Sequence, residues 1–239
     1  TKLKIFDNAK YKIINNNLEY SKKDITFDVK NNSIYVNNRS IENLEFKNYN
    51  FISYKDEKYK INGRHEAYNL SACIAVLSIL GLSLDEIMLG FSKRSHLSHR
   101  LERFCTYDGV TYINDSKSTN SDSTFNALES VEGNIVLIMG GDNKKISYNA
   151  LKNIINNKVK LLILIGENRE YVNNQLSVNI DTILLETLKD ATDYIFANLK
   201  SNCTVLFSPG SSSFSLYKNF EHRGNHFKTL VSNYVRGKT

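Results

Sequence analysis

The pattern of apolar and polar positions divides the chain into two parts of different character. Within the first 60 residues, short runs of strand-type composition are separated by polar stretches, and Asn-Asn pairs at 31–32 and 37–38 indicate turns. The runs are residues 12–14, 25–29, 33–36 and 51–54. This pattern predicts a short antiparallel meander.

A helical pattern follows the predicted meander. Apolar side chains recur there at the i, i+3, i+4, i+7 spacing of one helix face. They are Leu70, Cys73, Ile74, Leu77 and Leu80. Gly81 is expected to end this helix, because glycine is common just after a helix. Ser83, with Glu86 three positions on, is typical of a capping box and predicts a second helix that reaches about Phe91.

Residues 93–99 are polar and lack periodicity, so we expect a linker and a domain boundary there. Beyond it, continuous apolar runs at 134–139, 159–165 and 204–207 alternate with helical patterns such as 184–199. Alternating apolar strands and helices predict an α/β fold with a mostly parallel sheet. Ligands of such sheets bind at the carboxyl ends of the strands. The loops concerned are residues 140–144, 166–168 and 208–213.

Composition narrows the class of protein. With 41% hydrophobic and 23% charged residues among 239, the chain is globular in type and not disordered. No apolar run reaches the roughly 18 residues of a membrane helix. Three scattered cysteines favour a reducing compartment. The net charge of +6 is compatible with solvated lysines or with an anionic ligand, and no aromatic-basic motif indicates nucleic-acid binding.

Three polar segments are candidates for chemistry. Residues 114–120 follow a strand-like run at 110–113 and read either as a helix-capping turn or as an anion-binding loop with Asp as acceptor and Lys as donor. Residues 140–144 combine paired glycines with Lys144, and residues 208–214 place small hydroxyl side chains before a helix. The three segments are expected to converge on one cleft that faces a carboxylate or phosphate.

These segments resemble the Mur ligase family, most closely its members that add D-glutamate. The stretches that carry the resemblance are His99-Arg100-Leu101-Glu102, residues 114–120 (NDSKSTN, where the family reads NDSKATN), residues 140–144 and residues 208–227. It covers only the C-terminal half of a family member. Residues 1–97 resemble the end of the central ATP-binding domain, which carries the meander, and residues 98–239 the Rossmann-like C-terminal domain.

The resemblance implies an ATP-dependent, ADP-forming amide ligase that uses Mg²⁺. ATP would phosphorylate the carboxylate of UDP-N-acetylmuramoyl-L-alanine, and the amine of D-glutamate would then displace phosphate. Because the uridine-nucleotide domain and the P-loop are not in this sequence, the chain alone is expected to be inactive. A cytoplasmic monomer that binds neither nucleic acid nor membranes is expected.

The resemblance also implies roles for individual residues. The catalytic residues would be Lys2, the metal ligand if carbamylated, and Lys117, near the reacting phosphate. The ATP contacts would be Asn69, Arg100 and Asp115. The D-glutamate contacts would be Lys144 and Thr119 on one carboxylate, Ser213 on the other, and Phe214 and Phe220.

Two positions depart from the family pattern. Glu66 replaces an Asn beside an ATP contact, and a negative charge there is unfavourable near phosphates. Ser215 replaces an Asp. Two alternative functions remain: a sister ligase with another acceptor, such as another Mur ligase or a folylpolyglutamate synthase, and a basic binding module without enzymatic activity.

Overall fold

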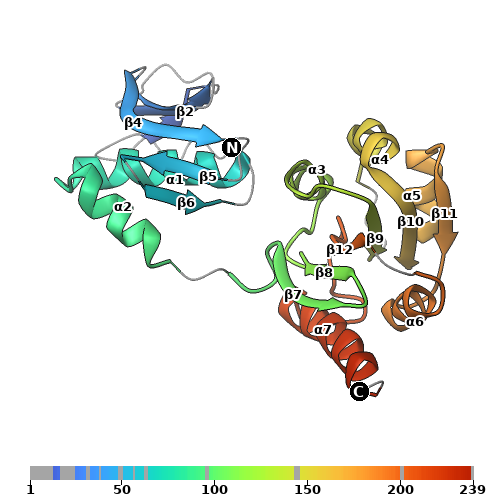
Figure 1. Cartoon of the computed structure of the whole chain (residues 1–239). Coiled ribbons are helices and arrows are strands. Elements are labelled where there is room, and N and C mark those ends of the chain that lie inside the picture. The colour runs from blue at the N-terminus through green and yellow to red at the C-terminus, as the bar shows by residue number, and fades with distance from the viewer. Residues whose placement is uncertain are drawn as a thin grey trace. The chain divides into compact units, whose positions relative to one another are not determined.

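The structure is a computed structural model in which the chain forms two compact units, Thr1–Ser95 and His96–Thr239 (Figure 1). It describes residues 13–16, 25–30, 33–37, 39–47, 51–55, 57–61, 64–94, 97–142, 146–199 and 202–237. Each unit has its own hydrophobic core, and each is described by itself. Within these ranges, none of the helices combines the length and apolar character needed to cross a bilayer.

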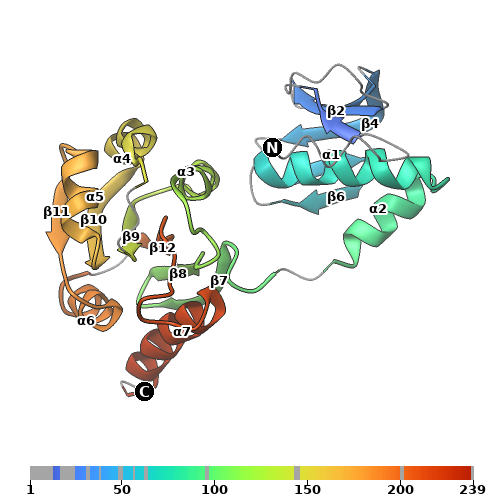
Figure 2. The same ribbon diagram turned by 180° about the vertical axis from the view of Figure 1, so that it is seen from behind.

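Unit 1 is a six-stranded sheet covered by a helix. Its strands follow one another in sheet order and are β1 (Ile13–Asn15), β2 (Ile25–Lys30), β3 (Ser33–Val36), β4 (Arg39–Lys47), β5 (Phe51–Tyr54) and β6 (Glu57–Lys60). Helix α1 (Arg64–Ile79) packs on β2 and β3 (Figure 2), and α2 (Leu84–Ser92) begins at the Ser83–Glu86 capping box that the sequence predicted.

The predicted antiparallel meander is confirmed, with β2, β3 and β5 among its predicted strands, but the prediction differs from the structure in two respects. β1 pairs with β2 in parallel, not antiparallel. In addition, β4 and β6 were not predicted, because their sequences RSIENLEFK and EKYK are too charged to resemble strands. Pairing with neighbouring strands satisfies the backbone of these segments, and local composition does not report that pairing.

Unit 2 contains the parallel sheet that the sequence predicted. Its order is β11-β10-β9-β12-β8-β7, and only the edge strand β7 runs antiparallel. The strands are β7 (Glu102–Tyr107), β8 (Val110–Asn114), β9 (Ile135–Gly141), β10 (Val159–Gly166), β11 (Asp181–Leu184) and β12 (Cys203–Phe207). The edge strands β7 and β11 were not predicted. They are half-exposed and lack the continuous apolar run of a central strand.

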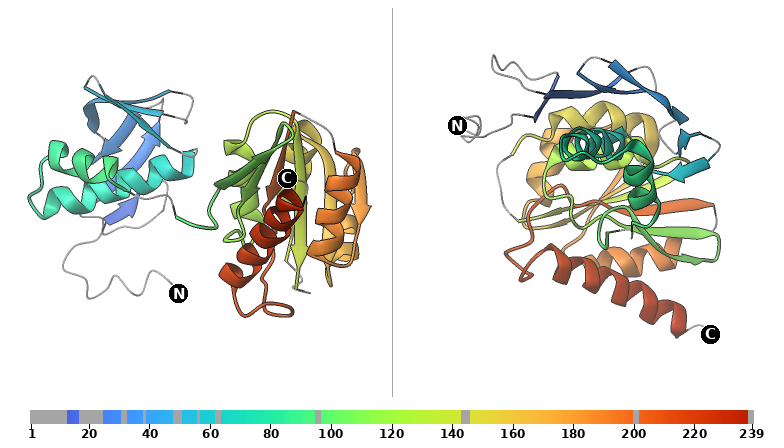
Figure 3. Two further views of the ribbon diagram at one scale, coloured as in Figure 1. Left: turned by 60° about the horizontal axis from the view of Figure 1, so that its bottom comes forward. Right: turned by 90° about the vertical axis from the view of Figure 1, so that its left-hand side faces the viewer.

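Helices cover both faces of this sheet (Figure 3). One face carries α3 (Ser121–Ser130), the short η2 (Asn149–Leu151), α4 (Lys152–Lys158) and α5 (Arg169–Leu176), and the other carries α6 (Leu188–Asn198) and α7 (Phe220–Arg236). In β9, Leu137 and Met139 are buried under the first group and Val136 and Ile138 under the second. Burial on both faces explains why the central strands are apolar throughout.

Lys158 ties α4 to the end of α3. Its ammonium donates hydrogen bonds to the carbonyl oxygens of Leu128 at 2.7 Å and of Glu129 and Val131 at 3.1 Å. These carbonyls lie at the C-terminus of α3, where a cation also interacts favourably with the helix dipole.

We expect Lys158→Met to lower the stability of unit 2 by about 1–2 kcal/mol, because three carbonyls lose a charged donor. Slow amide hydrogen exchange in β9 and β10 would measure it. Lys160→Met is the matched control, since Lys160 is exposed on β10 and a surface substitution of this kind stays within about 0.5 kcal/mol. Equal losses in the two variants would contradict the capping role.

Candidate functional site

The carboxyl ends of β8, β12 and β9 are adjacent in unit 2, with β12 hydrogen-bonded between the other two. The chain leaves β12 towards α7 on one face, whereas it leaves β8 and β9 towards α3 and α4 on the other. Diverging connections of this kind open a crevice beyond the strand ends, where ligands of α/β sheets bind. The topology therefore predicts ligand binding at the loops after β8, β9 and β12, which the sequence had also selected.

Backbone hydrogen bonds join these loops. The N–H of Gly210 donates to the carbonyl of Ser118 at 3.0 Å, which connects the loop after β12 with the loop after β8. The N–H of Gly140 donates to the carbonyl of Pro209 at 2.8 Å, which connects it with the end of β9. The three segments that the sequence selected are thus held at one edge of the sheet.

Asn168, which follows β10, is completely buried and connects four segments. Its side-chain oxygen accepts from the N–H of Gly141 at 2.9 Å. Its side-chain nitrogen donates to the hydroxyls of Ser211 at 2.8 Å and of Tyr148 at 3.2 Å. Tyr148 and Ser211 are also buried and hydrogen-bonded to each other at 2.6 Å. Sequence reasoning had included Asn168 only as part of a loop.

Arg223 on α7 is a buried cation with only neutral hydrogen-bond partners among the described residues. Its guanidinium donates to the hydroxyl and the carbonyl of Ser116, at 3.0 and 2.9 Å. It also donates to the carbonyls of Ser211 at 2.9 Å and Ser212 at 3.1 Å. Burial lowers the pKa of Arg223 to about 10, which leaves it positively charged at neutral pH.

Asp115 is a buried anion at the end of β8. Its carboxylate accepts from the hydroxyls of Ser118 at 2.5 Å and Ser208 at 2.8 Å and from the N–H of Leu101 at 3.1 Å. Burial raises the pKa of Asp115 to about 6, although these hydrogen bonds act in the opposite direction. Both oxygens are thus already bonded within the protein, and the contact with ATP expected for Asp115 stays a prediction.

A second polar cluster surrounds Asn114, and its contacts were not predicted from the sequence. The side-chain nitrogen of Asn114 lies 2.9 Å from Nδ1 of His99 and 3.1 Å from the carboxylate of Glu102. Lys228 donates to Glu102 at 2.6 Å. Burial opposes ionisation of Glu102, but the hydrogen bonds from Lys228 and the His99 backbone prevail and hold its pKa below the usual range. His99, expected in a polar linker, is instead buried within unit 2.

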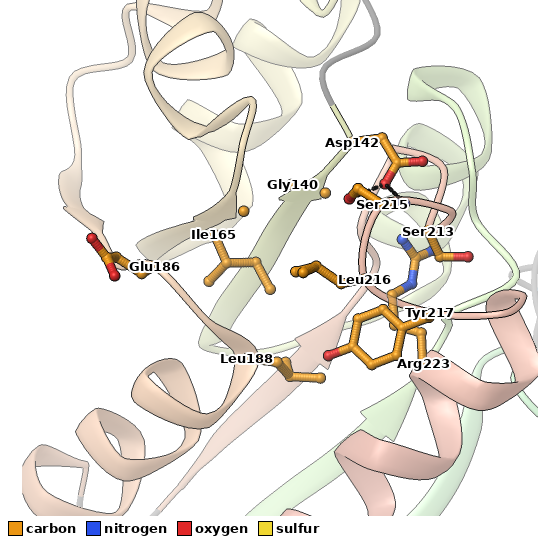
Figure 4. Close-up of a pocket in the computed structure, with 12 residues that line it drawn as sticks. Gly140, Asp142, Ile165, Glu186, Leu188, Ser213, Ser215, Leu216, Tyr217 and Arg223 are labelled. Atoms are coloured by element: carbon orange, nitrogen blue, oxygen red, sulfur yellow. Dashed lines mark hydrogen bonds between the residues drawn. The ribbon is translucent and has the colours of Figure 1, made fainter.

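A pocket opens between the ends of β9 and β10 and the connection from β12 to α7 (Figure 4). Ile165, Leu216 and Tyr217 face one another across it, and Asp142 lies at its rim. Asp142 accepts hydrogen bonds from the N–H groups of Phe214 at 2.7 Å and Ser215 at 2.9 Å. Burial opposes ionisation of Asp142, but the hydrogen bonds from Ser215 and Phe214 outweigh it and lower its pKa. Asp142 is therefore an anion, and its hydrogen bonds hold the turn at residues 214 and 215.

The structure brings several of the predicted site residues onto two neighbouring loops. Lys117 and Thr119 are exposed on the loop after β8, and Ser213 is buried on the loop after β12. Phe220 is the first residue of α7, and its ring lies 3.8 Å from the ammonium of Lys117. Phe214 is 73% exposed.

The remaining predicted residues lie in different units or outside the described residues. Asn69 is exposed on α1 of unit 1, and Arg100 is exposed just before β7 of unit 2. Lys2 and Lys144 lie outside the described residues. The roles predicted for these four residues stay predictions.

Both departures from the family pattern have partners in the structure. Arg94 donates two hydrogen bonds to one oxygen of Glu66, at 2.8 and 3.0 Å, and stacks on the ring of Phe91 at 3.6 Å. The negative charge of Glu66 is therefore balanced within unit 1. Ser215 donates from its hydroxyl to Asp142 at 2.6 Å.

The raised pKa of Asp115 predicts a pH-dependent stability. The folded-state pKa of Asp115 is near 6, above the usual 3.8, so protonation of Asp115 favours the folded state. This contribution to the stability of unit 2 is fully present below about pH 4 and is lost as the pH rises through 6. Two pKa units correspond to roughly 3 kcal/mol. We expect Asp115→Asn to gain about this much stability relative to wild type between pH 4 and pH 8.

Hydrogen exchange of the β9 and β10 amides at several pH values would measure the difference. The exposed Asp181, changed to Asn, is the control and should follow wild type. If Asp115→Asn keeps a constant stability difference from wild type over this pH range, the assignment of Asp115 is wrong.

We expect Arg223→Met to cost about 3 kcal/mol or more, because three buried carbonyls lose their donor. Arg169→Met is the matched control, since among the described residues Arg169 donates to a single carbonyl, that of Gly166 at 3.0 Å, and should cost about 1 kcal/mol or less. Urea denaturation combined with hydrogen exchange would compare them, and similar losses would argue against Arg223 as the tie between the loops.

Comparison with known proteins identifies relatives of this chain. The domain family described as "Mur ligase, glutamate ligase domain" matches residues 99–210. A protein of Chlorobium limicola named UDP-N-acetylmuramoylalanine–D-glutamate ligase is 40% identical over 174 residues, which are 73% of this chain and 37% of that protein. A Prochlorococcus marinus protein of the same name is 36% identical, over 75% of this chain and 39% of its own length. The chain thus spans about two fifths of these relatives.

Solved structures share the fold at low sequence identity. The UDP-N-acetylmuramate-alanine ligase MurC of Thermotoga maritima is 16% identical, with a TM-score of 0.60 over 90% of this chain and 49% of that one. FolC of E. coli is 15% identical, with a TM-score of 0.55 over 88% and 46%. Taken together, the matched domain, the curated relatives and the fold show that this chain belongs to the Mur ligase family.

Proposed function

We propose that this chain is the acceptor-binding part of an ATP-dependent ligase that adds D-glutamate to UDP-N-acetylmuramoyl-L-alanine. The observation that carries the proposal is the pairing of the loop of residues 114–120 with the loop after β12. These two loops carry Lys117, Thr119 and Ser213, residue types that suit a dicarboxylate. The curated relatives named for this reaction support the choice of acceptor.

The proposed reaction has two steps. ATP transfers its terminal phosphoryl group to the carboxylate of UDP-N-acetylmuramoyl-L-alanine, giving an acyl phosphate. The amine of D-glutamate then attacks the acyl carbon, so that the C–N bond forms, the C–O bond to phosphate breaks, and the amine loses a proton. The residues of this chain contribute mainly by orienting the amine towards the acyl carbon.

The acceptor would be held at both carboxylates. We assign one carboxylate to Thr119 and Lys144 and the other to Ser213 with its neighbouring backbone, while Phe214 and Phe220 contact the carbon chain. Arg223 stays positively charged, and Asp142 is the anion whose charge acts on it. Lys117 would meet the phosphoryl group as it leaves.

ATP contacts are assigned to Asn69, Arg100 and Asp115. A related ligase, MurF of Thermotoga maritima, was solved in complex with ADP and has a TM-score of 0.57 at 11% identity. Magnesium does not fit the described residues by themselves, because no three His, Cys, Asp or Glu side chains gather there. Lys2, the expected ligand, lies outside them, and no step here involves the metal.

We further propose that residues 1–97 are the end of the central ATP-binding domain and residues 98–239 the C-terminal domain of a cytoplasmic, monomeric ligase. The second candidate is a sister ligase with another acceptor. The likeness to FolC, solved with DHPP and ADP, extends to the fold alone and does not favour that acceptor class.

D-Glutamate titrated into the 239-residue chain should shift the NMR amide signals of residues 117–119 and 213–220, and L-glutamate should bind at least about 10-fold more weakly. Thr119→Val and Lys144→Met should each weaken D-glutamate binding about 10-fold or more, because each removes a hydrogen bond to a charged group. Thr106→Val on the exposed edge of β7 is the matched control and should bind as wild type does.

Another outcome would select the second candidate. If L-glutamate or another amino acid binds more tightly than D-glutamate, and Thr119→Val leaves D-glutamate binding unchanged, the chain takes a different acceptor.

A further inference from the structure

The side chain of Lys117 is held against an aromatic ring. Its ammonium lies 3.8 Å from the centre of the Phe220 ring, although the two residues are 103 positions apart in sequence. A cation over an aromatic face within about 6 Å is attracted by the negative potential of the ring. Lys117 is otherwise exposed at the end of a flexible four-carbon stem, so this contact restricts where its charge lies.

Phe220 is itself fixed from other sides. Its carbonyl accepts a hydrogen bond from the hydroxyl of Ser116 at 2.9 Å, and that hydroxyl accepts from Arg223 at 3.0 Å. The ring of His99 meets the Phe220 ring edge-on, with centres 6.2 Å apart and an interplanar angle of 79°. Asn219 caps α7 by accepting from the N–H of His222 at 2.8 Å. The ring is therefore the fixed partner and the lysine the mobile one.

We propose that Phe220 is a positioning residue that sets the direction of the Lys117 ammonium. This inference rests on the proposed function, in which Phe220 contacts the acceptor amino acid and Lys117 meets the phosphoryl group. One side of the ammonium faces the ring, and its other side stays open to an anionic oxygen. The contact connects the acceptor-binding residues with the residue that meets the phosphoryl group. An acceptor amino acid that fixes the segment of residues 213–220 would therefore also fix the position of Lys117.

Nuclear magnetic resonance of the 239-residue chain with ¹³C-dimethylated lysines tests the pairing directly. The methyl signals of Lys117, assigned with Lys117→Arg, should be shifted upfield by the Phe220 ring. Phe220→Leu should abolish the upfield shift, whereas Phe220→Tyr should retain it, because tyrosine keeps the aromatic face. If Phe220 only stabilised the fold, Phe220→Leu and Phe220→Tyr would not differ in the upfield shift of the Lys117 methyl signals.

Phe104→Leu is the matched control. Phe104 packs edge-on against Phe227 in the core of unit 2, with ring centres 5.5 Å apart, and none of the described lysines lies over its ring. Its loss should lower stability without moving the Lys117 signal. If Phe220→Leu leaves the Lys117 signal as in wild type while hydrogen exchange reports a folded α7, the proposal is overturned.

Adding D-glutamate separates this inference from the proposed function. In wild type we expect D-glutamate to move the Lys117 methyl signals, and in Phe220→Leu we expect it to move the amide signals near Thr119 but not those methyl signals. If wild type shows no response to D-glutamate at all, the proposed function fails, while the upfield shift still decides whether Phe220 positions Lys117. If Lys117 responds equally in both proteins, the link through Phe220 is disproved.

Discussion

The carboxyl edge of the parallel sheet depends on one buried cation, Arg223. A guanidinium taken out of water loses several kcal/mol of hydration and must recover it from groups inside the protein. Here those groups are the hydroxyl and carbonyl of Ser116 and the carbonyls of Ser211 and Ser212. Three backbone carbonyls from two loops must point at one side chain, and this requirement fixes the loops relative to each other and to α7.

Asp115 is a buried anion whose hydrogen bonds compensate only in part for its loss of hydration. It is buried beside serine hydroxyls and a backbone N–H, and burial raises its pKa to about 6. It therefore sits close to its titration point at neutral pH, whereas Arg223 stays charged.

Gly224 shows how tightly α7 is packed against the strand ends. A Cβ there would lie 3.0 Å from both the Asn114 side-chain oxygen and the Ser116 Cβ and would collide with the His99 ring. Only a residue without a side chain lets Arg223 and Phe220, on the same helix, reach the loop after β8. The close approach of this helix is therefore a precondition for both the Arg223 contacts and the Lys117–Phe220 pair.

Local sequence determined much of this protein. Apolar runs long enough to be buried on both faces predicted β9, β10 and β12, because such runs have no other stable place than the centre of a parallel sheet. The Ser83–Glu86 capping box was also predictable, because both partners are neighbours in sequence. The loops between these elements could be selected as candidate sites from strand direction alone.

Tertiary structure decided the rest. The parallel pairing of β1 with β2, the burial of His99, and the pairing of Glu66 with Arg94 each join residues that no short-range pattern relates. The same holds for Arg223, which sequence reasoning had not selected, and for Lys117 with Phe220. Hydrophobic periodicity reports which face of an element is buried, whereas the partner of a charged side chain depends on which loops the fold brings within hydrogen-bonding distance.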